Sequence, residues 1–221
     1  MKKQIGLLIL ISVIISSCGT KKMNDKTSFD TFKNNFIEAL WKTYPEWANS
    51  EGYHKYDSVL VVPNQQQRSR ELAFCKIYMD SLHGFDLKSL SESNQIDYHL
   101  IENQLLSAQW SINEFKAYEW NPSLYNVAGG FASLLNEKYA PLDQRLHSFN
   151  IKLTHVPDYY KAAQANINRP TIVHTNLAID QNKGSIGIFE KDLADSLAHS
   201  HLSEVEKQEI QSNVFAMKSN G

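Results

Sequence analysis

The chain contains few of the residues that interrupt helices or cross-link a fold. Only 9 glycines, 6 prolines and 2 cysteines occur among its 221 residues. Apolar positions recur every three or four residues rather than in alternation, which is the period of a helix. We therefore predict an all-α fold, an irregular array of many helices.

Several motifs are also absent from the sequence. It contains no HExxH, CxxC, EF-hand loop, GxSxG or P-loop, and so lacks the usual signatures of a zinc helix, a nucleophile elbow or a phosphate loop. His199 and His201 are two positions apart. On a helix they would point about 200° away from each other, too far apart to share an ion. We predict no catalytic residue, no metal ligand and no cofactor in this chain.

The charge balance excludes one class of partner. The formal net charge is -2, and no basic stretch is long enough to follow a phosphate backbone. Nucleic acid is therefore not an expected partner.

The first residues, MKKQIGLLILISVIISSCGT, combine a basic start with an uncharged apolar run that is too short to span a bilayer. The ISSC at their end matches the bacterial lipobox, after which a signal peptidase cuts before a lipid-modified cysteine. We predict a signal peptide at 1–17, lipidation of Cys18 and a polar tether at 18–27. This places the protein in the bacterial cell envelope, anchored to a membrane on the periplasmic face or the cell surface. A buried apolar helix with a chance cysteine is the alternative.

Lipidation of Cys18 would leave Cys75 as the only thiol, so no intramolecular disulfide could form. Cys75 lies at helical spacing from Leu72, Met79 and Leu82, which favours a small core residue over a reactive thiol.

Proline, glycine and the apolar period divide the rest of the chain, 28–221, into helices and loops. We expect a loop over SEGYHKYDSVLVVPN, 50–64, with a short extended piece at 59–62, and at Gly184 and Gly187 a turn or an interruption of a helix. The expected helices are 29–48, kinked or divided at Pro45, 64–82, one from the SLSES segment to near Trp120, 130–139, 142–155, 157–167, one beyond Pro170 and one from Ser203.

The third of these helices carries the widest apolar stripe, which predicts burial on two sides inside a bundle. The stripe consists of Ile101, Leu105, Ala108, Ile112 and Phe115, with Leu100, Leu106 and Trp110 beside it.

The last helix begins with Ser203 and Glu206 at the spacing of a capping box. Its apolar residues need a partner surface. Either the helix folds back on earlier helices, or the natural polypeptide is longer. These residues are Val205, Ile210, Val214, Phe215 and Met217.

Two loop segments contain candidate functional residues. In EGYHKYD, His54 lies near Asp57 with Tyr56 between them, and a histidine beside a carboxylate could perform acid–base chemistry. The alternative is a polar, partly exposed loop.

In AYEWNPSLYNVAGGF, Pro122 disfavours helical geometry at the preceding residue. The segment is either a helix-to-helix corner filled by Trp120 and Tyr125, or the lining of a cleft that also includes Glu119 and Asn121.

These segments form part of a longer succession: a tryptophan followed by Pro-Glu, then Gly-x-His-x-Tyr-Asp, Glu-Trp-Asn-Pro-x-x-Tyr and Ala-Pro-x-x-x-Arg. In order and spacing this succession resembles the amino-terminal half of the bacterial domain of unknown function 885 family, which includes many lipoproteins. The resemblance implies an all-helical enclosure similar to those of helical zinc peptidases. Complete members carry a HExxxGH-type motif in a carboxyl-terminal half that this chain lacks, and their histidines would hold zinc.

We therefore expect the amino-terminal fragment of a membrane-anchored lipoprotein that resembles a zinc-dependent peptidase or hydrolase. Zinc is expected only in complete members, and a peptide is the expected substrate. The rival hypothesis is a non-catalytic helical lipoprotein that binds a peptide or a protein partner. The residues expected to line a cleft are His54, Tyr56, Asp57, Glu119, Trp120, Asn121 and Tyr125.

Overall fold

The computed structural model describes the backbone of residues 26–220 and the side chains of residues 28–218. This part of the chain is helical, with no strand. The predicted signal peptide and Cys18 lie outside the described residues, as does most of the predicted tether. The all-α prediction is confirmed.

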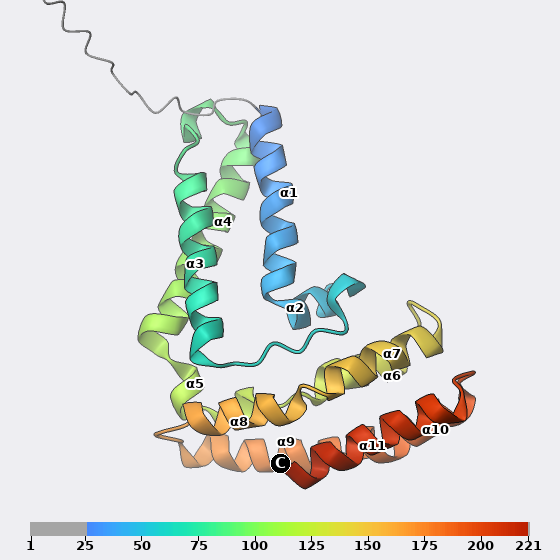
Figure 1. The fold of residues 1–221 in the computed structure, drawn as a ribbon. Helices are drawn as coiled ribbons and strands as arrows, with labels where there is room; N and C mark the ends of the chain where they lie inside the picture. Colours follow the sequence, from blue (N-terminus) through green and yellow to red (C-terminus); the bar gives the residue numbers. More distant parts are fainter. Residues whose placement is uncertain (1–25, 221) are drawn as a thin grey trace, which may run out of the picture.

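The helices form two groups (Figure 1). Three of them stand side by side as an upright group: α1 (Lys26–Thr43), α3 (Gln65–Leu82) and α4 (Glu92–Trp110). The others lie across its foot as a base: α6 (Ala128–Asn136), α7 (Leu142–Leu153), α8 (Val156–Asn166), α9 (Ile172–Gly187), α10 (Leu193–His199) and α11 (Glu204–Asn220).

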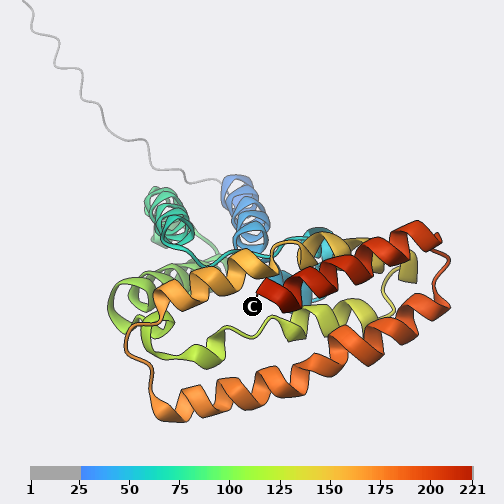
Figure 2. The ribbon, with the colours of Figure 1, turned by 60° about the horizontal axis from the view of Figure 1, so that its bottom comes forward.

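Two short helices join the groups, α2 (Pro45–Ser50) and α5 (Ala117–Trp120). Figure 2 shows the segment that leads from α5 into α6 running between α8 and α9. The chain that leaves the upright group therefore packs between two helices of the base.

Each group has its own hydrophobic core, and burying one large apolar side chain contributes about 1.5–3 kcal/mol. In the upright core, α1 contributes three phenylalanines. The buried residues of this core are Phe29, Phe32, Phe36, Leu40, Cys75, Leu82, Phe85, Leu90, Tyr98, Ile101 and Leu105. The core of the base includes Phe131, Leu134, Leu146, Phe149, Leu153, Phe189, Leu193, Leu197 and Ile210.

Several helix ends lie where the sequence predicts them. Pro45 begins α2 and separates it from α1, because proline has no N–H to continue a helix. The backbone N–H of Ser203 donates to Glu206 at 2.8 Å, and the N–H of Glu206 donates to the Ser203 hydroxyl at 3.3 Å. The capping box is confirmed. The predicted interruption near the glycines falls at Gly187, where α9 passes into a π-helical turn.

The third helix differs from the prediction. It is regular only to Trp110, continues as a π-helical turn over Ser111–Phe115 and breaks at Lys116, whose φ is 49°. A positive φ is uncommon for a residue other than glycine, and here it ends the helix before α5. Burial on two sides is also wrong within the described part, because Leu100 and Leu106 are 62% and 52% exposed.

The last helix folds back onto α7 and α8, the first of the two alternatives considered. Ile210 and Val214 join the core of the base, whereas Val205 and Phe215 are each 74% exposed. Within residues 26–220, no helix combines the length and the apolar character needed to cross a membrane.

Candidate functional site

The first candidate segment turns sharply after α2. Gly52 has a φ of 79°, a conformation that glycine adopts without steric cost. The chain then forms a 3₁₀ turn, His54–Tyr56, and the three-residue spacing brings the ring of His54 over Asp57. The local sequence therefore aligns the histidine and the carboxylate that it predicts as partners.

Asp57 is 5% exposed and accepts hydrogen bonds from three side chains. Asn49 Nδ2 donates to its Oδ1 at 2.8 Å, and the Tyr139 hydroxyl donates to its Oδ2. Nδ1 of His54 lies 3.2 Å from the same Oδ2. A carboxylate oxygen accepts, so Nδ1 donates to Asp57 in the tautomer that carries the proton there; Asn49 Nδ2 lies 3.3 Å from the same nitrogen.

Tyr139 comes from the segment between α6 and α7 and covers the histidine. The two rings lie parallel, with centroids 3.3 Å apart. Burial, together with the hydrogen bond to Asp57, raises the pKa of Tyr139 well above its ordinary value. Tyr139 is therefore a permanent donor at neutral pH, and it fixes the carboxylate in place.

Arg145, in the first turns of α7, lies near the same group of side chains and is 6% exposed. Its Nε donates to the carbonyl of Ala140 at 3.0 Å, and its Nη1 donates to the carbonyls of Leu134 and Leu135 at 2.6 and 3.0 Å. The last two carbonyls belong to the final turn of α6. Arg145 thus neutralises the negative end of that helix.

These groups surround one depression of about 430 Å³, which we call the polar hollow. It is lined by Gly52, His54, Asp57, Tyr139, Ala140, Pro141, Gln144, Arg145 and Ser148. The Gly-x-His-x-Tyr-Asp segment and the distant Ala-Pro-x-x-x-Arg segment therefore meet at one place. Sequence reasoning singled out the first segment for its chemistry, but no signal marked Tyr139, Gln144 or Ser148.

Tyr56 points away from the polar hollow toward α1. Its hydroxyl donates to Glu38 Oε1 at 2.5 Å, and Tyr53 donates to Oε2 of the same carboxylate at 2.5 Å. Lys55 pairs with Glu38 as well. Hydrogen bonds from Lys55, then from the two tyrosines, lower the pKa of Glu38 to about 2. This cluster ties the turn to the upright group.

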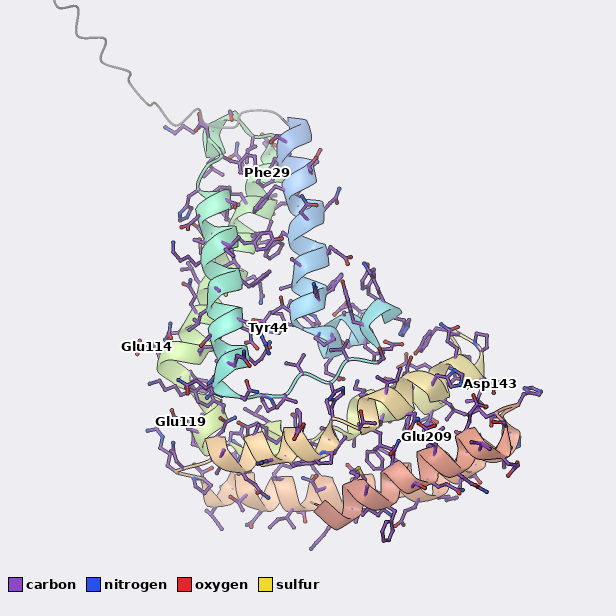
Figure 3. All side chains as sticks on the ribbon, in the orientation of Figure 1. Phe29, Tyr44, Glu114, Glu119, Asp143 and Glu209 are labelled. Atoms are coloured by element: carbon purple, nitrogen blue, oxygen red, sulfur yellow. The ribbon has the colours of Figure 1, made fainter. Side chains whose placement is uncertain are left out.

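The second candidate segment forms the corner between the two groups. Figure 3 shows Glu119 at the foot of the upright group, next to the base. The carbonyl of Glu119 accepts from the N–H groups of Asn168 and Arg169 at 3.0 and 3.2 Å, and its carboxylate lies 3.2 Å from Arg169. The carbonyl of Trp120 accepts from Thr171 at 3.1 Å. The corner is thereby hydrogen-bonded to the loop between α8 and α9.

Side chains of the same segment hold its shape. Oδ1 of Asn121 accepts from the N–H and the hydroxyl of Ser123, at 3.1 and 2.6 Å. Trp120 Nε1 donates to the Phe115 carbonyl at 3.1 Å. These contacts are those of a helix-to-helix corner. A role for Glu119, Trp120 and Asn121 in lining a cleft stays a prediction.

Tyr125 is 6% exposed. Its hydroxyl donates to the Tyr118 carbonyl at 2.8 Å and accepts from Asn166 Nδ2 at 3.1 Å. It borders a shallow depression with Tyr160. Among the depressions described for residues 28–218, none is lined by both candidate segments.

A larger depression, of about 520 Å³, lies where the upright group meets the base. Tyr44, labelled in Figure 3 at the foot of α1, lines it together with Glu46. Glu46 pairs with Lys152, whose side chain is 2% exposed. No sequence signal marked this buried lysine as the partner of a glutamate on α2.

Metal ligands do not gather in the part of the chain that the structure describes. Within it, no three His, Cys, Asp or Glu side chains are close enough to hold an ion. His199 Nδ1 lies 2.7 Å from the carbonyl of Asp195, and His201 lies beside Asp143. The two histidines thus have separate partners.

The chain is similar to known proteins in two comparisons. The family model described as "Bacterial protein of unknown function (DUF885)" matches residues 45–218. A solved structure described as that of "a putative lipoprotein of unknown function from Shewanella oneidensis" is 44% identical and superposes with a TM-score of 0.84. The match covers 87% of this chain and 35% of that protein, so the chain spans about a third of its relative's length. The comparison with curated proteins gave no match.

Proposed function

Because the chain belongs to the DUF885 family of bacterial proteins, we propose that it is the amino-terminal helical part of a membrane-anchored lipoprotein that resembles zinc-dependent peptidases. The observation that carries the lipoprotein assignment is the 44% identity to the Shewanella oneidensis protein, itself described as a "putative lipoprotein". The ISSC sequence ending at Cys18 agrees with it.

The proposed anchor follows from simple energetics. Burial of acyl chains contributes about 0.8 kcal/mol per CH₂, and two or more chains on one residue make release slow. The first helix begins at Lys26. A tether of only a few residues would therefore hold the fold close to the membrane surface.

Lipidation is tested by expression in a bacterium that processes lipoproteins, with labelled palmitate in the medium. We expect label on the parent protein and recovery in the membrane fraction. Cys18→Ser should lose both, whereas Cys75→Ser, at the buried cysteine, is the matched control and should keep both. Label retained by Cys18→Ser would contradict the proposal.

The hydrolase part of the proposal places the metal site outside the described residues. They hold no ligand trio, so no catalytic step is assigned to them, and their proposed role is to form part of the wall around a peptide substrate. The relative's length supports this arrangement, since this chain matches only 35% of it.

The gene sequence beyond the codon for Gly221 provides the test. We expect the reading frame to continue into a histidine- and glutamate-containing helix, and the whole product to retain zinc through dialysis and to hydrolyse peptides. A stop codon directly after Gly221, with no such helix encoded nearby, would count decisively against the hydrolase proposal.

The second candidate function is a non-catalytic lipoprotein that binds a peptide or a protein partner. The polar hollow favours it, because polar side chains from two segments far apart in the sequence, among them His54, Asp57 and Arg145, converge there. A monomer with cooperative melting that binds a ligand on its own would support this candidate. Aggregation of the purified chain would instead favour a fold completed by further helices.

A further inference from the structure

The guanidinium of Arg145 has an unused edge. Nε and Nη1 donate to three carbonyls, but Nη2 has no hydrogen-bond partner within residues 28–218 and is not sealed from solvent. In the same part of the chain, Arg145 forms no ion pair, although its side chain is 6% exposed. The negative end of α6 carries only about half an elementary charge, so it matches the guanidinium in part. Arg145 lines the polar hollow, and Nη2 is the guanidinium nitrogen that its hydrogen bonds leave free.

Two further donors lie on the same side of α7. Gln144 and Ser148 are one helical turn apart and line the hollow with Arg145. In the described part of the chain, neither side chain has a hydrogen-bond partner. The N-terminus of α7 has no side-chain cap, so the positive end of its dipole adds to the attraction for an anion.

The opposite wall limits the charge of that anion. Asp57 is buried there and held by three donors. A dianion such as phosphate would be repelled by this carboxylate, whereas a single negative charge is matched by the guanidinium. Arginine presents two N–H groups in a plane, which suits the two oxygens of a carboxylate.

We propose that the polar hollow is a binding site for a carboxylate group, held by Nη2 of Arg145 with Gln144 and Ser148 as supporting donors. The site rests on the second candidate function, ligand binding by this chain, and names the chemical group bound; it requires neither the lipid anchor nor a metal. The carboxylate can come from the carboxyl terminus of a peptide or from a small organic acid.

Calorimetric titration of the purified protein with four probes tests the site: trialanine, trialanine carboxamide, acetate and inorganic phosphate. We expect trialanine to bind about tenfold or more tightly than its carboxamide, because only the acid carries the charge. Trialanine far tighter than acetate would identify a peptide terminus, and equal affinities would identify a small acid. Equal binding of acid and carboxamide, tighter binding of inorganic phosphate, or no binding would overturn the proposal.

Variants locate the binding. Ser148→Asp adds a carboxylate to the lining of the hollow, three residues after Arg145 on α7, so it should abolish trialanine binding and raise the melting temperature. Arg145→Lys should weaken binding about tenfold or more, since lysine lacks the planar fork. Arg169→Gln, which removes an exposed arginine at the corner, is the control and should leave affinity unchanged. Because Arg145 also caps α6, a folding defect in its variant would leave Ser148→Asp as the deciding measurement. Unchanged affinity in Ser148→Asp would refute the site.

Discussion

Replacement of Glu46 by glutamine isolates the ion pair that joins the upright group to the base. Lys152 is 2% exposed and pairs with Glu46, which is 47% exposed. The lysine Nζ also lies 5.7 Å from the centroid of the Phe131 ring. Glu46→Gln keeps the shape and removes the charge, and so leaves a buried ammonium without its counter-ion.

The expected cost follows from this asymmetry of burial. Loss of one partner from a fully buried pair costs about 3–5 kcal/mol. Glu46 is half exposed, so water can reach Lys152 from its side, and the cation–π contact offsets about 0.5–1 kcal/mol. We therefore expect Glu46→Gln to lower the free energy of unfolding by about 2 kcal/mol.

Lys152→Met gives the opposite test, because methionine keeps the apolar stem and removes the charge. Replacement of a buried ion by a packed apolar group is often neutral, so the change should stay within about 1 kcal/mol. Once the ammonium is gone, the glutamine at position 46 should cost little. The double variant should then be about as stable as Lys152→Met alone.

Urea unfolding followed by far-ultraviolet circular dichroism measures all four proteins. Glu114→Gln, an exposed glutamate labelled in Figure 3, is the matched control and should change stability by less than about 0.5 kcal/mol. The reasoning is refuted if Glu46→Gln is as stable as the parent, or if Lys152→Met is the more damaging of the two single changes.

Three further predictions rest on other sites. Gly130→Ala places a Cβ against the Glu46 carboxylate and 2.7 Å from Lys152 Nζ. Overpacking should outweigh the higher helix propensity of alanine and lower the free energy of unfolding by about 1–2 kcal/mol, measured by urea unfolding. The pKa of Glu38 is lowered from 4.5 to about 2, so its contribution to stability is complete above pH 4.5 and is lost as the pH falls through about 2. Glu38→Gln should reduce the change in the free energy of unfolding across that pH window, and an unchanged dependence on pH would contradict the assignment. Burial, with a smaller contribution from a nearby glutamate, raises the pKa of Cys75 to about 11; in the mature protein at pH 8 its thiol should react with Ellman's reagent only after unfolding, and fast labelling of the folded protein would refute its burial.

The helix ends set by backbone chemistry could be read from single residues. Pro45 and the Ser203–Glu206 pair act within one turn of chain, so their effect does not depend on distant packing. The break at Lys116 has no such signal, because the apolar period runs unbroken through Phe115. The left-handed residue is followed by α5, which packs against α8, a contact far apart in the sequence.

For the same reason, the sequence predicts only some of the residues of the candidate site. His54 and Asp57 are three residues apart, and a short turn necessarily brings them together. Tyr139 is 82 residues from Asp57, and Arg145 is placed by the carbonyls that end α6. Nothing in a single sequence states which helix end an arginine will cap, so this half of the hollow appears only once α6 and α7 are packed.

The exposed stripe on α4 shows what hydrophobic periodicity reports. Leu106 and Trp110 are more than half exposed within the described fold, yet they are four residues apart, the spacing of residues that meet another surface. A stripe of this kind indicates every surface that a helix covers, including surfaces contributed by segments outside the chain in hand. The solved relative is far longer, since this chain matches 35% of it. The stripe and the difference in length thus support the same part of the proposed function, a helical enclosure completed by further segments.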